Sequence, residues 1–529
     1  MREIIYYNGD ILTMDETLYV DAILIRNGLI HKIGCKDDIL KFKNENTKVI
    51  NLKGKTLMPS FIDSHSHLSA LATTLGLVPL GDVTSIEELI NKIKEFKNSK
   101  SIPKGKWIVG FGYDNNSLPN SKHPNKDILD KASIDNPIMI SHASGHMGVL
   151  NSLALKKLGI GKDTTDPEGG VIGRVGNTNE PNGYLEENAF MQYSSKMDKP
   201  SLKSISKQIE EAQNIYLSYG ITTAQEGIMK DAEFNLLSFI AENHKLKIDL
   251  VGYVDLKNSK YLMDNNEYLK KYVNRFKIGG YKIFLDGSPQ GKTAWLTKPY
   301  ENSADYRGYA IYNDKEVEDF VRTALDENIQ LLTHCNGDAA ADQLLNSFQD
   351  ILGKGNSAKR IRPVIIHAQT VRYDQLDEMK TLDMIASFFV AHTYYWGDIH
   401  IFNLGEDRAF KISPLRSAIK KGVLYTLHQD SPVIAPNMLE TVWAATNRST
   451  KSGVIIGADE RISPLEALKG VTINAAYQYF EEDKKGSITE GKLADLVILD
   501  KNPLKVDPME IKNIQVLETL KEGKRLFKK

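Results

Sequence analysis

The sequence predicts an α/β fold in which a (β/α)8 TIM barrel carries an insertion after its first strand and is joined to a small β domain built from both termini. Two patterns lead to this prediction. Short apolar runs alternate with amphipathic helix patterns through the middle of the chain, whereas both ends contain short strands without helices. At 529 residues the chain is long enough for one large domain and a smaller one.

Both ends of the chain consist of predicted strands broken by turns. Residues 1–58 contain EIIYYNGDILTMD, DAILIRNGLIHKIG and KVINLKGKTLMP, and the Asn-Gly pair in the second segment is typical of a hairpin. Residues 481–529 contain GKLADLVILD and NIQVLETLKEGKRLF. Neither end has a helix large enough to cover its strands. We therefore expect the two ends to form one composite β domain.

Residues 59–480 contain eight predicted strands. In chain order they are FIDSHSH (61–67), GITTAQE (220–226), KIDLVGYVD (247–255), YKIFLDG (281–287), IQLLTHC (329–335), PVIIHAQ (363–369), MIASFFVAHTYY (384–395) and VLYTLHQD (423–430). Helix patterns such as KEVEDFVRTALDEN separate most of them, so a barrel explains the count better than an open sheet. The long gap between the first two strands predicts an insertion over about residues 70–200.

Composition excludes several classes of function. The chain has 67 basic and 68 acidic residues and no prominent basic stretch, so it lacks the footprint of a nucleic-acid-binding protein. No apolar stretch approaches the roughly 20 residues that a membrane helix needs. The two cysteines, Cys35 and Cys335, cannot build a disulfide framework. We expect a cytoplasmic protein that acts on a small molecule, with a homodimer left open.

Polar residues gather where the predicted barrel strands end. His65 and His67 leave the same face if residues 61–67 are extended, which would let two imidazoles reach one metal ion. Active sites of such barrels lie at the carboxyl ends of the strands. Further candidates at or near these ends are Lys282, His334, His367 and Asp430. Each alone would more often be structural, but their order along the strands is not readily explained by chance.

At these residues the chain resembles the metal-dependent amidohydrolase superfamily, and within it the YtcJ-like branch that includes N-substituted formamide deformylases. The resemblance covers nearly the whole chain. The motifs that carry it are PSFIDSHSH, SGHMGVLNSLAL, GITTAQE, KIFLDGS followed by KTA, THCNGDAA, IIHAQ, DSPV and GSITEGKLADLVILD. Ser60 stands where the superfamily usually has Gly.

This resemblance implies a barrel, a flanking β-sandwich made from both termini and a centre of one or two divalent metals. It implies that His65, His67 and Asp430 hold one metal and that His334 and His367 hold the second. Lys282, as a carbamate formed with carbon dioxide, would bridge the two metals. Zinc suits imidazole and carboxylate ligands best, with iron or manganese as alternatives.

The resemblance also suggests which residues contact the substrate. His146 lies in SGHMGVLNSLAL and Glu187 in GYLEENA, and together with Asp286 and Trp295 they are the candidate substrate-binding residues. His146 could equally be structural. Four further histidines are assigned to packing or to the surface: His142, His392, His400 and His428.

The expected activity is hydrolysis of an amide-type C–N bond other than a peptide bond. Metal-bound hydroxide would attack the carbonyl carbon, and Asp430 would pass the proton to the leaving nitrogen. One alternative is a mononuclear deaminase of a heterocycle. Those enzymes usually have a Glu shortly after the fifth-strand histidine, where this chain has only Asp338. Another is a catalytically inactive binding or regulatory protein on the same scaffold.

Overall fold

The computed structural model describes residues 3–197, 201–264 and 266–529. The chain divides into two compact units. The larger unit consists of Met1–Ala70 and Ala212–Lys529, and the smaller one of Leu71–Glu211. The smaller unit covers most of the segment that the sequence marks as an insertion.

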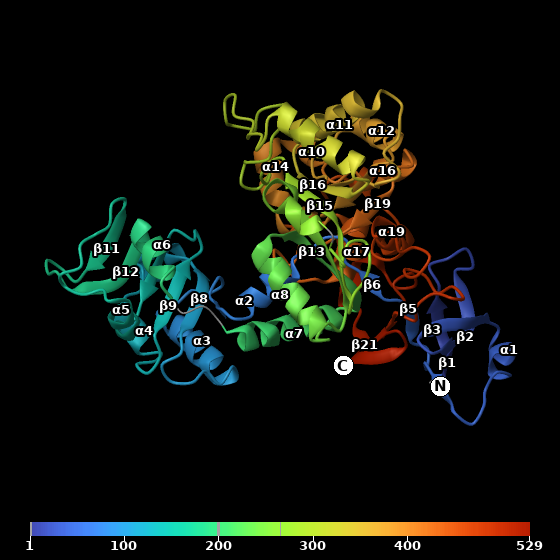
Figure 1. Cartoon of the computed structure of the whole chain (residues 1–529), viewed down its shortest axis with the longest axis horizontal. Coiled ribbons are helices and arrows are strands. Elements are labelled where there is room, and N and C mark those ends of the chain that lie inside the picture. Colours follow the sequence, from blue (N-terminus) through green and yellow to red (C-terminus); the bar gives the residue numbers. More distant parts are fainter. Residues whose placement is uncertain (1–2, 198–200, 265) are drawn as a thin grey trace. The chain divides into compact units, whose positions relative to one another are not determined.

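The central element of the larger unit is a sheet of eight parallel strands (Figure 1). In spatial order these are β6 (Phe61–Ile62), β13 (Ile221–Met229), β14 (Asp249–Asp255), β15 (Phe276–Phe284), β16 (Gln330–Cys335), β17 (Val364–His367), β18 (Ile385–Phe388) and β19 (Tyr425–Leu427). All neighbouring pairs are parallel. Each strand overlaps one predicted segment, and the alternation of strands with helices confirms the α/β fold.

Helices follow most of these strands. They include α8 (Asp231–Glu242), α10 (Asp314–Asp326), α11 (Asp338–Leu352), α12 (Tyr373–Thr381), α14 (Gly397–Leu404), α16 (Leu415–Lys420), α17 (Met438–Asn447), α18 (Pro464–Gly470) and α19 (Ile473–Gln478). Helix α10 shows why such segments are helical. Asn313 and Glu316 form a reciprocal capping box at its start, and Val317, Val321 and Ala324 form a buried stripe at helical spacing.

Several predicted strands are shorter than expected, including the first and the seventh. Strand β6 ends at Ile62, so His65 and His67 lie beyond it rather than on an extended strand. The chain leaves the sheet there because the backbone N–H of His67 donates to the carbonyl of Ser431, 2.8 Å away. In the seventh predicted strand, β18 ends at Phe388 and the helix α13 (His392–Tyr395) follows.

The segments that follow the first and the last strand of this sheet are hydrogen-bonded to each other. Besides the bond from His67 to Ser431, the N–H of Asp430 donates to the carbonyl of His65 at 3.2 Å. The hydroxyl of Ser64 donates to the carbonyl of Leu427 at 3.0 Å. These bonds fix His65, His67 and Asp430 beside one another at the carboxyl end of the sheet.

Strands from both ends of the chain share a second sheet in the larger unit. Its order is β22 (Lys524–Lys528), β21 (Val516–Lys521), β20 (Leu496–Leu499), β5 (Thr56–Pro59), β1 (Glu3–Leu12), β2 (Tyr19–Arg26) and β3 (Leu29–Gly34), with β4 (Thr47–Asn51) also paired to β1. The two ends meet where β5 and β20 pair antiparallel. Ile23, Leu57 and Leu496 are buried in the core of this sheet.

The smaller unit has its own sheet and core. The sheet order is β11 (Gly170–Arg174), β12 (Pro181–Glu187), β10 (Met147–Leu150), β9 (Ile138–His142), β8 (Ile108–Tyr113) and β7 (Val78–Pro79). Helix α3 (Ile86–Ser99) buries Leu89 and Ile93, which share one core cluster with Ile138 and Ile140 of β9. The insertion is therefore a folded body rather than a long loop.

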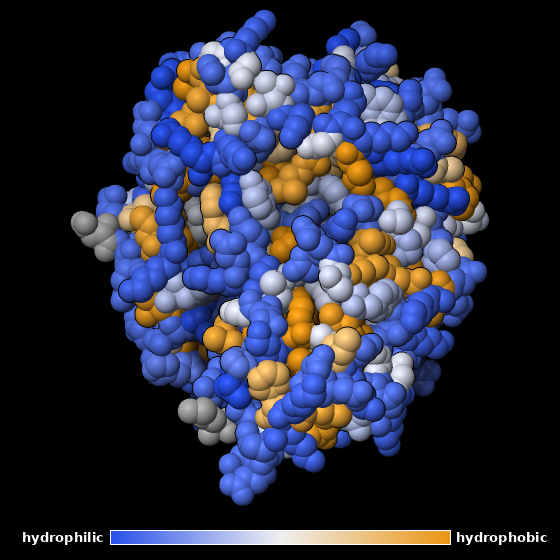
Figure 2. Space-filling model, turned by 90° about the vertical axis from the view of Figure 1, so that its right-hand side faces the viewer, coloured by the Kyte–Doolittle hydropathy of each residue, from blue (hydrophilic) through white to orange (hydrophobic). Residues whose placement is uncertain are grey.

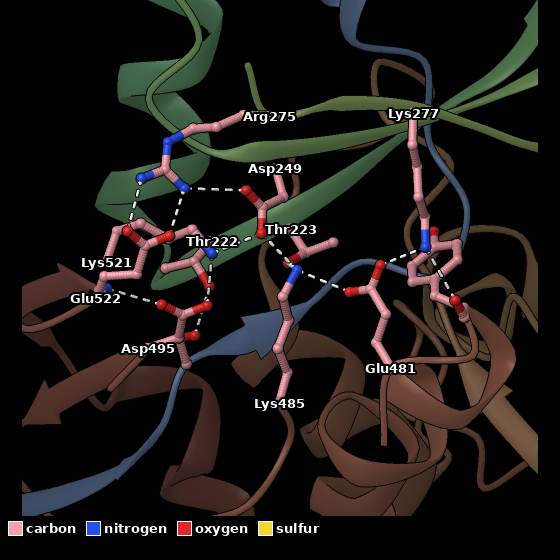
Figure 3. A network of polar contacts seen from close by, with 12 residues as sticks. Thr222, Thr223, Asp249, Arg275, Lys277, Glu481, Lys485, Asp495, Lys521 and Glu522 are labelled. Carbon is pink, nitrogen blue, oxygen red and sulfur yellow. Dashed lines mark hydrogen bonds and ion pairs between the residues drawn. The ribbon is translucent and has the colours of Figure 1, made fainter. Parts of the chain in front are cut away.

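A network of ion pairs, buried except at the pair of Arg275 with Glu522, lies at the amino ends of β14 and β15 (Figure 3). It contains four cations and four carboxylates: Arg275, Lys277, Lys485, Lys521, Asp249, Glu481, Asp495 and Glu522. We call it the amino-end network. Lys521 on β21 lies 2.6 Å from both Asp249 and Asp495, so the network joins the terminal sheet to the parallel sheet.

The surface is mainly hydrophilic on the face shown in Figure 2, where hydrophobic residues are scattered between polar ones. Among the described residues, no helix has both the length and the apolar character required to cross a membrane. This agrees with the absence of a long apolar stretch in the sequence.

Candidate metal centre

Three of the predicted ligands converge at the carboxyl end of the parallel sheet. One ligand atom each of His65, His67 and Asp430 lies within 4.8 Å of the others. Oδ1 of Asp430 is 3.5 Å from Nε2 of His65 and 3.4 Å from Nε2 of His67. Burial favours the neutral carboxyl group of Asp430, but the His67 ring outweighs it and holds the pKa of Asp430 below its usual range. The carboxylate is thus ionised and ready to bind a cation.

The other two predicted histidine ligands lie on neighbouring strands. His334 is near the end of β16 and His367 ends β17, and Nδ1 of His334 is 3.1 Å from Nε2 of His367. Nε2 of His334 can donate to the carbonyl of Gly287, 3.2 Å away, which leaves Nδ1 free as an acceptor. Oδ2 of Asp430 is 4.0 Å from Nε2 of His367. Asp430 therefore lies between the two histidine pairs.

Burial keeps these imidazoles neutral, as metal ligation requires. It lowers the pKa of His334 to about 4 and places the pKa values of His65 and His367 well below the usual range. His67 differs, because its contact with Asp430 outweighs burial and raises its pKa. A cation bound by Asp430 would compete with a proton on this ring.

Lys282 lies on β15 and is fully buried. Its Nζ has no hydrogen-bond partner in the described part of the chain. Burial lowers the pKa of the amine to about 7, against the opposing attraction of Asp430. An unpaired buried ammonium group is costly, so this position favours the neutral amine.

Strained backbone coincides with two of the ligand candidates. The φ angle is +77° at His367 and +54° at Asp430, a region that residues other than glycine seldom adopt. Such conformations persist where surrounding structure holds them, and they cluster at functional sites. The strained residues are thus His367, which ends β17, and Asp430, which follows β19.

Sequence reasoning missed the residues that contact the outer nitrogens of the first histidine pair. Oε1 of Gln225 is 2.6 Å from Nδ1 of His65, and Oε1 of Glu226 is 3.8 Å from Nδ1 of His67. Burial raises the pKa of Glu226 to about 7 despite His67. The sequence did contain a signal for them, because Gln225 and Glu226 are polar residues at the carboxyl end of the second predicted strand, GITTAQE.

His428 also belongs to this group, although the sequence analysis assigned it to packing or the surface. Its ring is fully buried, and its centroid is 5.3 Å from that of His65. Nε2 of His428 is 3.2 Å from Nδ1 of His367. His428 therefore packs directly behind the candidate ligand His367.

The four candidate substrate-binding residues divide between the units. In the smaller unit, Nδ1 of His146 is 3.0 Å from Oε2 of Glu187, and both side chains are exposed. In the larger unit, Asp286 accepts N–H groups of Trp295 at 3.0 Å, Asn336 at 2.9 Å and Gly337 at 2.7 Å. Both oxygens of Asp286 are thus used to hold backbone beside His334. A role for all four in substrate binding stays a prediction.

Comparison with known proteins agrees with this geometry. Residues 48–527 match the amidohydrolase family. The chain belongs to the amidohydrolase family. It is accordingly an enzyme of the class that hydrolyses C–N bonds, as the sequence motifs predicted.

Relatives of this amidohydrolase span nearly its whole length. It is 27% identical to N-substituted formamide deformylase of Arthrobacter pascens, with 99% of this chain and 98% of that protein aligned. It is 26% identical to the putative amidohydrolase YtcJ of Bacillus subtilis, with 99% of each aligned. These relatives confirm the predicted YtcJ-like branch.

A solved structure shows the same likeness. An uncharacterized metal-dependent hydrolase from Pyrococcus furiosus superposes with a TM-score of 0.75 at 26% sequence identity, covering 95% of this chain and 100% of that one. Together with the family match, it supports a divalent metal as cofactor.

Proposed function

We propose that this amidohydrolase cleaves an amide-type C–N bond of a small molecule at a centre of one or two divalent metals, with zinc as the first candidate. The observation that carries the proposal is the position of Asp430. Its Oδ1 faces His65 and His67 at 3.4 to 3.5 Å, and its Oδ2 faces His367 at 4.0 Å. One carboxylate thereby adjoins both histidine pairs.

The residues present fit such a centre. His65, His67 and Asp430 would hold one ion, and His334 with His367 would hold a second. The facing nitrogens of His334 and His367, 3.1 Å apart on largely neutral rings, form a donor pair of the type that zinc accepts. When bound, the metal supplies a Lewis acid and lowers the pKa of water toward neutrality.

Asp430 is proposed to move the proton. Its carboxylate is ionised, so it can accept the proton of the attacking water and then donate it to the leaving nitrogen as the C–N bond breaks. Glu226 has a raised pKa and is already bound by the N–H of Ser69, so it is less suited to this exchange. The products are a carboxylic acid and an amine.

Lys282 is proposed to bridge the two metals as a carbamate. The neutral amine adds carbon dioxide and loses a proton, which converts a buried base into a carboxylate-like ligand. Support comes from its full burial, its unpartnered Nζ within the described residues, and the lowered pKa of the amine. A lysine that merely reached toward water would not leave Nζ buried.

The finer architecture is also proposed. We infer that the eight parallel strands close as a (β/α)8 barrel, because the segments after β6 and β19 exchange backbone hydrogen bonds. We further propose residues 59–480 as the barrel domain with its insertion, and residues 1–58 with 481–529 as a β-sandwich domain. The shared terminal sheet supports this division.

The deaminase alternative has less support. The acidic residue after the fifth-strand histidine, Asp338, accepts the N–H of Thr297 at 2.9 Å and pairs with Arg372 at 3.4 Å. Its carboxylate is therefore engaged with neighbouring loops. A catalytically inactive protein on the same scaffold would bind metal without hydrolysing any amide.

Metal analysis combined with turnover tests the proposal. We expect the purified protein to hold one or two divalent ions per chain and to hydrolyse at least one member of a panel of small amides, N-substituted formamides included. A chelator should abolish turnover, and added Zn²⁺ should restore it. Bound metal without turnover of any amide would favour a binding role, and release of ammonia from a heterocycle would favour the deaminase.

A further inference from the structure

A line of hydrogen bonds runs away from the candidate ligand His367. Nδ1 of His367 is 3.2 Å from Nε2 of His428, and Nδ1 of His428 is 2.9 Å from Oγ of Ser387. Oγ of Ser387 is 3.4 Å from Oγ of Ser64, whose hydroxyl donates to the carbonyl of Leu427 at 3.0 Å. All four polar side chains are buried. We call this line the His367–Ser64 chain.

The far end of the His367–Ser64 chain indicates one direction for the bonds in it. A carbonyl oxygen can only accept, so the hydroxyl of Ser64 spends its proton on Leu427. Ser64 is then left as the acceptor of its 3.4 Å contact with Ser387. When Ser387 donates its proton there, it accepts from Nδ1–H of His428 at 2.9 Å. A neutral His428 with its proton on Nδ1 has a lone pair on Nε2.

That lone pair decides the state of His367. Nε2 of His428 accepts from Nδ1–H of His367, so a neutral His367 carries its lone pair on Nε2. Nε2 is the nitrogen that faces Nδ1 of His334 at 3.1 Å and Oδ2 of Asp430 at 4.0 Å. The chain therefore presents the ligating form of His367 to the candidate metal centre.

We propose that His428 is a positioning residue that selects the tautomer and the ring orientation of His367. The inference rests on the proposed metal ligands and extends them to a residue that touches no substrate. Partners of this kind typically contribute 10–100-fold to metal affinity, because they orient the ligand before the ion arrives. If His428 only filled space, neither its hydrogen bond to Nδ1 of His367 nor its hydrogen bond to Oγ of Ser387 would be needed.

Two substitutions of His428 separate these roles. His428→Leu fills a similar volume without an acceptor, and His428→Gln can still accept from His367 and donate to Ser387. We expect the Leu variant to bind Zn²⁺ about 10–100-fold more weakly at the ion that depends on His367, as measured by chelator competition. The Gln variant should stay within a few-fold of wild type.

Three further proteins complete the experiment. His367→Ala identifies the ion that depends on His367, and His400→Leu makes the same substitution at a buried histidine that pairs with His392 instead. Ser387→Ala, expected to weaken Zn²⁺ binding several-fold, carries the test if His428→Leu does not fold by circular dichroism. In Co²⁺-loaded protein, the Nδ1–H of His367 should give a shifted, slowly exchanging proton resonance that the Leu variant loses and the Gln variant keeps.

The outcomes distinguish this inference from the function on which it depends. If His367→Ala lowers metal binding but His428→Leu does not, the metal site stands and the positioning role is wrong. Equal weakening by Leu and Gln would also overturn it, since only bulk or the ring would then matter. If His367→Ala leaves metal content unchanged, both the second metal ion and the role of His428 fail.

Discussion

The two ends of the parallel sheet treat buried lysines in opposite ways. Lys282, near the carboxyl end, is fully buried with no hydrogen-bond partner in the described ranges, and burial lowers its pKa to about 7. Lys485, at the amino end, is almost as buried but pairs with Asp249 and with Glu481 at 2.7 Å. These carboxylates outweigh burial and raise the pKa of Lys485. Similar burial thus accompanies pKa shifts in opposite directions.

The difference indicates what each end is built to do. In the amino-end network four cations meet four carboxylates, so no charge is left over to bind a ligand (Figure 3). Salt bridges hold the pKa of Glu481 at about 2 against burial. At the carboxyl end, the attraction of Asp430 does not outweigh the burial of Lys282, and the pKa of the lysine falls. Strongly shifted pKa values of buried groups often mark functional sites.

The largest expected effect comes from removing the unpaired amine. Lys282→Ala should abolish hydrolysis and lower metal content to one ion or none, because the bridging carbamate is lost. Lys282→Arg should fail as well, since guanidinium stays charged and does not capture carbon dioxide. Metal analysis and turnover measure both, and short carboxylates should partly rescue the Ala variant. Full metal content and full rate in Lys282→Ala would show that a single-metal site built on His65, His67 and Asp430 is the better account.

Asp430→Asn should have the next largest effect. The amide can still coordinate weakly but cannot accept a proton, so the rate should fall by about 10²–10⁴ while much of the metal stays bound. Steady-state turnover alongside metal content measures this split. Asp338→Asn is the matched control, because Asp338 is engaged by Thr297 and Arg372. Turnover near that of wild type in Asp430→Asn would remove Asp430 as the proton shuttle.

The sequence predicts residues that lie at strand ends better than it predicts contacts between side chains on different strands. The ligand candidates were predictable, because the carboxyl ends of the strands in a parallel α/β barrel lie on one face whatever the conformation of the loops. The contacts behind them were not, since pairing of Glu226 with His67, or of His428 with His367, depends on register across strands. The amino-end network was hidden for the same reason, as Asp249 and Lys521 are 272 positions apart.

One expectation from sequence also shows the limit of position alone. His65 and His67 were expected to share a face of an extended strand, yet β6 ends at Ile62. The two rings still lie 5.1 Å apart, because backbone bonds to the segment around Asp430 hold the turn. The proximity was predicted correctly, and its cause was not.

Equivalent substitutions at the two lysines should change stability in opposite directions. In metal-free, carbon-dioxide-free protein, Lys485→Met should destabilise by about 3–5 kcal/mol, because it leaves buried carboxylates undercompensated. Lys282→Met should instead stabilise by about 4 kcal/mol at pH 7, because it removes a buried amine whose attraction to Asp430 does not offset the cost of burial. Denaturant unfolding of both variants measures the difference.

The pH dependence gives this pair a second check. The pKa of Lys282 is about 7 when folded and near 10.5 in an open chain, so the unfolded state binds the proton more tightly. The loss of folding stability caused by the buried amine of Lys282 is therefore complete below pH 7. It decreases as the pH rises from 7 toward 10.5. The gain in Lys282→Met should shrink over the same window. A gain that does not vary with pH would mean that packing, rather than the amine, causes it.

The smallest expected effect lies at the rim of the amino-end network. Arg275 is partly exposed, and its two Nη atoms lie 2.8 and 3.1 Å from the carboxylate of Glu522, while Nη1 also reaches Asp249 at 3.0 Å. Arg275→Lys keeps the charge but loses the fork, so it can satisfy only part of this arrangement. Because solvent screens the outer pair, the loss should be no more than about 1 kcal/mol in urea unfolding, and turnover should be unchanged. Suppose instead that Arg275→Lys loses as much free energy of unfolding as Lys485→Met. The ion pairs of Arg275 would then contribute as much to stability as those of Lys485, and the contrast between the two ends of the sheet would depend on the whole network.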